Sequence, residues 1–146
     1  GVRHNIVPDE VKLEGTIRAF DEGQRDEIHA HVKRITEMIS AAGGARAHVH
    51  IDRGYPVTVN TPENTAFAAE VAAAVSGQID TDTPPLMGAE DFSFMLNERP
   101  GAYIFLGNGD SASCHHPAYD FADSAIPYGV SYWVRLAETV LAGEAT

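Results

Sequence analysis

The amino-acid sequence predicts an α/β fold, and three observations support that prediction. Apolar and polar residues alternate along residues 11–20 and 45–51, as they do in strands with one buried face. The segments that follow, 21–42 and 61–76, instead place apolar residues three or four positions apart, which is typical of amphipathic helices. Residues 102–107 form a nearly all-apolar run of the kind found in buried strands.

The first half of the chain is expected to form a strand, a helix and a second strand. Val11, Leu13 and Ile17 fall on one face of the first strand, which predicts a strand with one dry side. A helix should begin after Asp21, because Gln24 three positions later completes a capping box. That helix should end near residue 42, where two glycines follow.

The second half is expected to begin with a helix capped by Thr61 and opened by Pro62. A short helix should follow and end before Pro100, because the residue that precedes a proline disfavours helical geometry. After the apolar run at 102–107, a loop containing histidines leads to a closing helix. Its buried face is predicted from an apolar stripe at helical spacing: Val130, Trp133, Ala137 and Val140.

Composition and charge exclude several classes of partner. The chain of 146 residues has a formal net charge of −11, which argues against nucleic acid and anionic membranes as partners. No apolar run approaches the roughly 20 residues that span a bilayer, and no signal region opens the chain. The single cysteine, Cys114, excludes an internal disulfide and fits a reducing compartment, so we expect a cytoplasmic protein.

The loop "SCHHPAYDFAD", residues 113–123, contains the adjacent pair His115 and His116. Neutral imidazole is a good ligand for zinc, cobalt or manganese. Adjacent histidines in a loop are also common as ordinary solvated residues. The residues by themselves leave both interpretations open.

Five motifs stand out along the chain: "HNIVPDEVKLEGTIRAFDEGQR" from residue 4, "YPVTVN" from 55, "MGAEDFSFML" from 87, "RPGAYIFLG" from 99 and "HHPAYDF" from 115. Their order and spacing resemble the metal-dependent aminoacylase and carboxypeptidase family. The closest branch contains hippurate hydrolase and the plant auxin–amino-acid hydrolases. Each motif alone is weak, but together they cover nearly the whole chain.

The resemblance is to the C-terminal part of such enzymes, and it implies two domains. Residues 1–58 would be the strand–helix–strand half of a ferredoxin-like lid domain, which also dimerises in many members. Residues 59–146 would be the C-terminal part of an α/β metallohydrolase catalytic domain. The family's His-x-Asp or Cys-x-His motif, its Glu-Glu pair and its lid histidine lie upstream of these residues, so no catalytic residue is expected here. The first residue is not methionine, and this N-terminus need not be a natural start.

The resemblance also assigns roles to individual residues. It implies that His115 is a terminal metal ligand, whereas His116 occupies a tolerant position. Asn5 and Arg18 match the lid asparagine and arginine that hold the substrate's carboxylate and carbonyl, a task that suits a guanidinium fork beside an amide donor. Arg18 is equally compatible with an ordinary solvated position on the polar face of its strand.

The segment "MGAEDFS", residues 87–93, is implied to lie beside the substrate. Gly88 precedes an expected helix start, where backbone N–H groups favour an anion. Glu90 is expected to take a polar role at the substrate, and Asp91 a lesser one. Both carboxylates are also ordinary residues for the first turn of a helix.

The sequence therefore predicts part of a metal-dependent amidohydrolase that cleaves the amide bond of N-acyl amino acids or similar conjugates. The intact site would hold two divalent ions of zinc, cobalt, manganese or nickel. The missing N-terminal part would supply the other ligands and the general base, so the isolated chain is expected to be inactive. A homo-oligomer is the expected assembly. The alternative is a noncatalytic interaction or dimerisation module derived from the lid, and the sequence upstream of Gly1 would distinguish the two.

Overall fold

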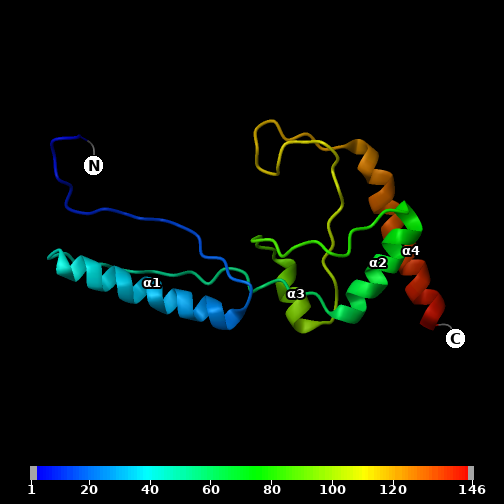
Figure 1. Ribbon diagram of the computed structural model, residues 1–146, viewed down its shortest axis with the longest axis horizontal. Helices are drawn as coiled ribbons and strands as arrows, with labels where there is room; N and C mark the ends of the chain where they lie inside the picture. Colours follow the sequence, from blue (N-terminus) through cyan, green and yellow to red (C-terminus); the bar gives the residue numbers. More distant parts are fainter. Residues whose placement is uncertain (1–2, 145–146) are drawn as a thin grey trace. The chain divides into compact units, whose positions relative to one another are not determined.

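The computed structural model describes residues 3–144, and the chain divides into two compact units. The first unit extends to Val57 and includes Met87–Ala89; the second comprises Thr58–Leu86 and the residues from Glu90 onward. The helices, in chain order, are α1 (Glu22–Ala42), α2 (Pro62–Ser76), α3 (Phe92–Glu98), the short 3₁₀ turn η1 (Asp123–Ala125) and α4 (Ile126–Glu144) (Figure 1). The identity of the two units as lid and catalytic parts stays a prediction.

The expected strands are not formed. Within residues 3–144 all regular structure is helical, and the segments 11–20, 45–51 and 102–107 contain no paired strand. An extended segment becomes a strand only when a neighbour completes its hydrogen-bond ladder, and alternation along the sequence does not supply that neighbour. Val11 and Leu13, expected on a dry face, are 73% and 88% exposed. The described residues therefore contain the expected helices but none of the expected strands.

Both ends of α1 follow the sequence signals. The side chain of Asp21 accepts a hydrogen bond from the backbone N–H of Gln24 at 2.8 Å, which confirms it as the capping residue. Gly43 follows the last turn and Gly44 takes a φ of 73°, a left-handed conformation that glycine adopts at little cost. The apolar stripe of the helix lacks cover, since Ile39 is 69% exposed.

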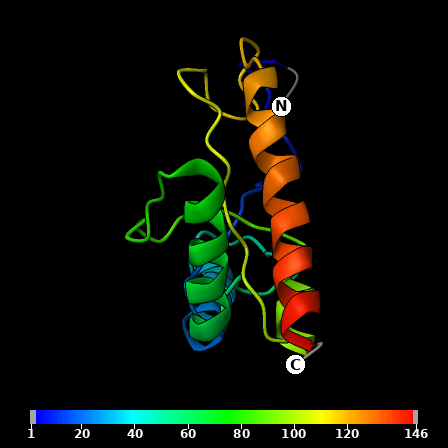
Figure 2. The same ribbon diagram turned by 90° about the vertical axis from the view of Figure 1, so that its right-hand side faces the viewer.

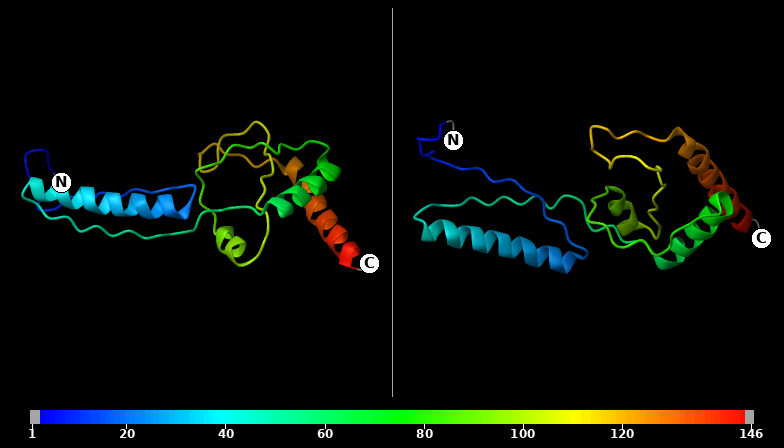
Figure 3. Two further views of the ribbon diagram at one scale, coloured as in Figure 1. Left: turned by 60° about the horizontal axis from the view of Figure 1, so that its bottom comes forward. Right: turned by 45° about the horizontal axis from the view of Figure 1, so that its top comes forward.

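The chain after α1 runs back along the helix, as both views of Figure 3 show, and Arg25 joins the two segments. Its Nη1 donates to the carbonyl oxygens of Arg53 at 3.2 Å and Tyr55 at 2.6 Å. Its Nη2 lies 2.6 Å from a carboxylate oxygen of Glu22. Arg25 is buried, and this pairing offsets the cost of removing a guanidinium from water. The returning segment is thereby anchored to the first turn of α1.

Glu22 and Arg53 extend this network. One carboxylate oxygen of Glu22 accepts from the backbone N–H of Val57 at 3.0 Å, and the other lies 3.1 Å from Nη2 of Arg53. Arg53 also forms an ion pair with Asp26. The hydrogen bond from Arg53 holds the pKa of the Asp26 carboxyl below its usual value. Because both of these side chains are exposed, water screens the pair and its contribution to stability is small.

The second unit buries its core between α2 and α4, which pack side by side (Figure 2). Ala68 and Val71 from α2 are each 4% exposed, and Ala125 and Tyr132 from η1 and α4 are 7% and 8% exposed. Within residues 3–144, no helix is both long and apolar enough to cross a membrane.

The ends of α2 and α3 agree with most of the sequence signals. Pro62 is the first residue of α2, and Gly77 follows its last turn with a φ of 68°. Thr61 precedes the helix, but its side chain makes no capping hydrogen bond, because its hydroxyl accepts from the Gly101 N–H instead. The short helix α3 ends at Glu98, ahead of Pro100. Prolines and glycines fix these ends through local backbone sterics, which is why the sequence locates them.

The buried face of α4 differs from the predicted one. Tyr132 is 8% exposed, whereas Val130 and Trp133 from the expected stripe are 57% and 65% exposed. The helix carries apolar residues on more than one face. Helical spacing identifies such faces but does not select the one that finds a partner.

An amide side chain holds the apolar segment 102–107 in place. Asn60 donates from Nδ2 to the carbonyl oxygen of Tyr103 at 2.9 Å and accepts from the Tyr103 N–H at 2.8 Å. Beside it, the Thr61 N–H donates to the carbonyl of Gly101 at 2.9 Å, and the Thr61 hydroxyl accepts from the Gly101 N–H at 3.2 Å. The Asn60 side chain therefore makes the two backbone hydrogen bonds to Tyr103 that a neighbouring strand would make in a sheet.

Candidate functional site

The segment 109–119, which we term the histidine loop, is closed at its neck by two polar side chains. Asn108 donates from Nδ2 to the carbonyl oxygen of Asp120 at 2.7 Å, and its Oδ1 accepts from the N–H of Ala122 at 2.8 Å. The hydroxyl of Ser111 donates to the same Asp120 oxygen at 2.9 Å and accepts from the Asp120 N–H at 3.3 Å. The two ends of the loop are thus joined through side chains.

The tip of the histidine loop is a tight turn. The N–H of His116 donates to the carbonyl oxygen of Ser113 at 3.0 Å, which puts His115 at the third position of that turn. His115 has a φ of 69° and is the one non-glycine residue within residues 3–144 with a positive φ. Type II turns require such a φ at this position and usually place glycine or asparagine there. For another residue the conformation costs about 1–3 kcal/mol, so the surrounding structure must hold it.

The two histidine rings have different environments. Nδ1 of His116 accepts from the backbone N–H of Ala118 at 3.1 Å, and the His116 carbonyl accepts from the N–H of Tyr119 at 2.9 Å. His116 therefore shapes the loop. The exposed ring of His115 has no hydrogen bond or ion pair among the described residues. It is the imidazole that remains available to a ligand.

His115 fits a metal as one donor, and the chain as described does not complete a metal centre. No group of three or more His, Cys, Asp or Glu side chains within residues 3–144 is placed to hold an ion. Cys114 is exposed and free, but a neighbouring thiol alone does not complete a coordination sphere.

Glu90 is half-buried in the second unit and is held through both its backbone and its side chain. Its carbonyl oxygen accepts from the hydroxyl of Ser93, which is fully buried, at 2.6 Å. Burial raises the pKa of the Tyr103 hydroxyl, and the negative charge of the nearby Glu90 carboxylate raises this pKa further. The rings of Phe92 and Phe105 flank Tyr103 with centroids 5.8 and 5.4 Å away. Glu90 is thus an oriented carboxylate, and its substrate role stays a prediction.

Gly88 lies in the first unit, whereas Glu90 lies in the second. The first residue of α3 is Phe92, so Gly88 is not at the N-terminus of that helix. A Cβ built at Gly88 would meet no atom within 4 Å, and its φ is not in the left-handed region. Its backbone in this structure therefore does not require glycine, and an anion role for it stays a prediction.

Asn5 and Arg18 both lie in the first unit and both are exposed. Asn5 sits in a turn closed by a 3.4 Å hydrogen bond from the Ile6 N–H to the Arg3 carbonyl. The guanidinium of Arg18 forms no ion pair among the described residues. No hydrogen bond joins Asn5 to Arg18 in the described structure, so the expected pairing on a substrate stays a prediction.

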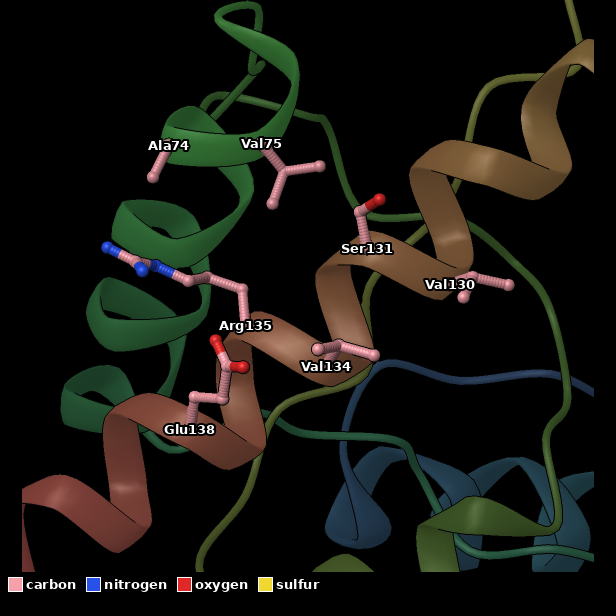
Figure 4. Close-up of a pocket in the computed structure, with 7 residues that line it drawn as sticks. All are labelled: Ala74, Val75, Val130, Ser131, Val134, Arg135 and Glu138. Carbon is pink, nitrogen blue, oxygen red and sulfur yellow. The ribbon is translucent and has the colours of Figure 1, made fainter.

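A depression of about 370 Å³ lies between α2 and α4 (Figure 4). Arg135 extends toward α2 across it, and Glu138 lies one turn further along α4. The lining residues are Ala74, Val75, Val130, Ser131, Val134, Arg135 and Glu138. The lining includes no histidine and no residue of the candidate site, so it does not add to the chemistry at His115.

The His115 ring is exposed and has no hydrogen-bond partner among the described residues, so it is compatible with a metal-dependent hydrolase in which other residues complete the site. Comparison of the sequence with protein families supports this class. Residues 4–139 match Peptidase family M20/M25/M40, and the chain belongs to that family.

Several curated relatives are similar to this chain. Thermostable carboxypeptidase 2 of Saccharolobus solfataricus is 37% identical over 119 residues, which are 80% of this chain and 30% of that protein. N-acetylcysteine deacetylase of Bacillus subtilis is 30% identical over 97% of this chain and 37% of its own length. Hippurate hydrolase of Campylobacter jejuni is 31% identical over 94% and 36% respectively. The chain thus spans about a third of the length of these relatives.

Sequence reasoning missed the residues that hold the candidate site. Asn108 and Ser111 close the neck of the histidine loop, and Tyr103 lies near the Glu90 carboxylate. The run "GNGDS" before the histidines is a recognisable turn signal, because Asn, Asp and Ser bond readily to nearby backbone. That signal does not show which distant carbonyl groups these side chains will reach.

Proposed function

We propose that the full-length protein is a metal-dependent amidohydrolase that cleaves the amide bond of N-acyl amino acids or similar conjugates, in the manner of a hippurate hydrolase. The observation that carries this proposal is the conformation of His115. A strained backbone persists where the surrounding structure enforces it, and such positions cluster at functional sites. Family membership indicates the kind of function that the strain serves.

A divalent metal bound in such a site supplies Lewis acidity and lowers the pKa of a bound water. The contribution of this chain is a neutral imidazole at a fixed place, held by the neck and the tip of the histidine loop. The proposal includes two ions per intact site, drawn from zinc, cobalt, manganese or nickel. Their other ligands and the general base would come from the N-terminal part of the enzyme.

The names of the relatives support the proposed class of substrate. Hippurate and N-acetylcysteine each carry an acylated amino group next to a free carboxylate, and a carboxypeptidase acts at a residue with the same two features. We extend this class to the present protein. Which acyl group and which amino acid it accepts would depend on pocket residues outside this chain.

Four residues are proposed to contact that substrate: Asn5, Arg18, Gly88 and Glu90. Arg18 is the best supported of them, because its guanidinium is exposed and has no carboxylate partner within residues 3–144. In a chain with a net charge of −11, an unpaired guanidinium is available to a substrate carboxylate. Assembly into a homo-oligomer also belongs to the proposal.

The test is hydrolysis by the purified full-length protein of hippurate and a panel of N-acetyl amino acids. We expect turnover that a chelator abolishes and that at least one of zinc, cobalt, manganese or nickel restores. Substrates whose carboxylate is replaced by an amide serve as matched controls and should react more slowly. Absence of turnover with every metal and substrate would contradict the proposal and favour the noncatalytic interaction module.

A further inference from the structure

We propose that Asn108 is a positioning residue for His115: it closes the neck of the histidine loop and thereby fixes the place from which the imidazole meets a metal. This inference rests on the proposed function, because it takes His115 to be a ligand. Asn108 itself is not proposed to touch the metal or the substrate. Its effect would be transmitted through the backbone of the loop.

The first step is the geometry of the amide group. A carboxamide offers a donor and an acceptor in one rigid plane, and Asn108 uses both, toward the Asp120 carbonyl and the Ala122 N–H. These two contacts join residues 12 and 14 positions apart in the sequence. The Asn108 side chain thus pairs backbone groups of Asp120 and Ala122 that a neighbouring strand would pair in a β-sheet. No strand is present in this part of the described structure.

The second step is what the neck does for the tip. A loop whose ends are joined has fewer accessible conformations than an open one, so less entropy is lost when its tip takes a single shape. The tip of this loop holds His115 at a φ of 69° through the turn from Ser113 to His116. With the neck open, the strained residue would be free to relax toward a negative φ, and its ring would leave its place.

The third step separates positioning from general stability. Asn108 also bonds to Ala122, whose carbonyl accepts from the N–H of Ala125, the last residue of η1, so its replacement could loosen α4 as well. Ser111 offers a cleaner variant because, apart from a weak 3.3 Å bond to the adjacent Ala112 carbonyl, its side chain is hydrogen-bonded only to Asp120 among the described residues. Ser113 is the matched control, since it lies in the same loop and its hydroxyl makes no hydrogen bond among the described residues.

The experiment measures metal affinity in the full-length protein by competition with a chromogenic chelator, and the absorption spectrum of the cobalt-loaded form. We expect Asn108→Ala and Ser111→Ala to weaken binding of one metal ion by about 10- to 100-fold. This is the range for replacing residues that hold a metal-ligating side chain in place without touching the metal. Both should alter the cobalt spectrum, whereas Ser113→Ala should match the parent. Asn108→Asp should resemble Asn108→Ala, because a carboxylate cannot donate to the Asp120 carbonyl.

The outcomes distinguish this inference from the proposed function. If His115→Ala loses an ion while both neck variants bind metal like the parent, the positioning role is wrong and the proposed function stands. If His115→Ala also binds metal like the parent, the ligand assignment itself fails. Thermal melting of each variant accompanies the titration. If Asn108→Ala melts well below the parent, the Ser111→Ala result decides, and an unchanged affinity there overturns the inference.

Discussion

His115 and His116 are identical side chains at adjacent positions, yet the structure gives them different tasks. The His116 ring accepts a backbone hydrogen bond from Ala118 and closes the loop tip, whereas the His115 ring is exposed and has no such partner within residues 3–144. The two residues also differ in backbone conformation, because His115 has a positive φ of 69° and His116 does not. A sequence motif can identify the two histidines but cannot show which ring is hydrogen-bonded within the loop and which is available to a ligand.

The backbone strain at His115 leads to a stability prediction. His115→Gly should be more stable than His115→Ala by about 1 kcal/mol, because glycine adopts the left-handed conformation without the Cβ clash that alanine retains. Urea unfolding of the two variants measures the difference. Cys114, whose φ is not positive, is the control position, and there glycine should be less stable than alanine. Equal stability of the two variants at position 115 would show that the conformation is not strained.

Among the proposed substrate residues, the sequence indicates residue type but not arrangement. Arg18 is exposed as expected for either of its two interpretations, so exposure does not decide between them. Glu90 is expected to take a polar role at the substrate, and the structure shows it half-buried near Tyr103. The sequence does not indicate that Tyr103 lies near Glu90, because the two residues are distant along the chain.

Helices were predicted well because their ends depend on nearby residues. Asp21, Pro62 and Gly77 each act within one helical turn, and each stands where the sequence placed it. Strands failed because a ladder needs a partner from elsewhere, and the alternation in residues 11–20 contains no information about that partner. In the second unit, Asn60 takes the place of such a partner for Tyr103.

The packing of α2 against α4 leads to a pH prediction. Burial raises the pKa of the Tyr132 hydroxyl above its ordinary value of 10.0. The unfolded chain therefore loses this proton at a lower pH than the folded one. The stability linked to Tyr132 should be fully present below about pH 10 and should be lost as the pH rises further.

Tyr132→Phe should flatten this alkaline loss, measured as the free energy of unfolding from urea titrations between neutral and strongly alkaline pH. The variant should still lose some stability at alkaline pH, because the pKa of Tyr103 is also raised. Tyr128→Phe is the matched control, because that residue lies on the same helix and is 50% exposed. An identical alkaline slope in Tyr132→Phe and the parent would contradict the burial of this hydroxyl.

At the scale of the whole molecule, the described residues bury few large side chains. The buried apolar residues among them are Ala68, Val71, Ala125 and Tyr132, while Leu13 and Trp133 remain 88% and 65% exposed. Extensive exposed apolar surface is characteristic of interaction sites. The order of the helices could be anticipated from the sequence. The residues that would cover these apolar faces could not be anticipated. An apolar pattern identifies a face, but the contacts that bury it involve residues elsewhere in the sequence.

The central claim is that His115 is a metal ligand of the full-length protein, and the metal content of His115→Ala tests it most directly. Parent, His115→Ala and His50→Ala are purified in parallel, and their bound divalent metal is counted by elemental analysis. His50 is an exposed histidine outside the candidate site and serves as the control. We predict that His50→Ala retains the parent's metal content and that His115→Ala contains about one ion fewer per chain. An unchanged metal content in His115→Ala would contradict the account.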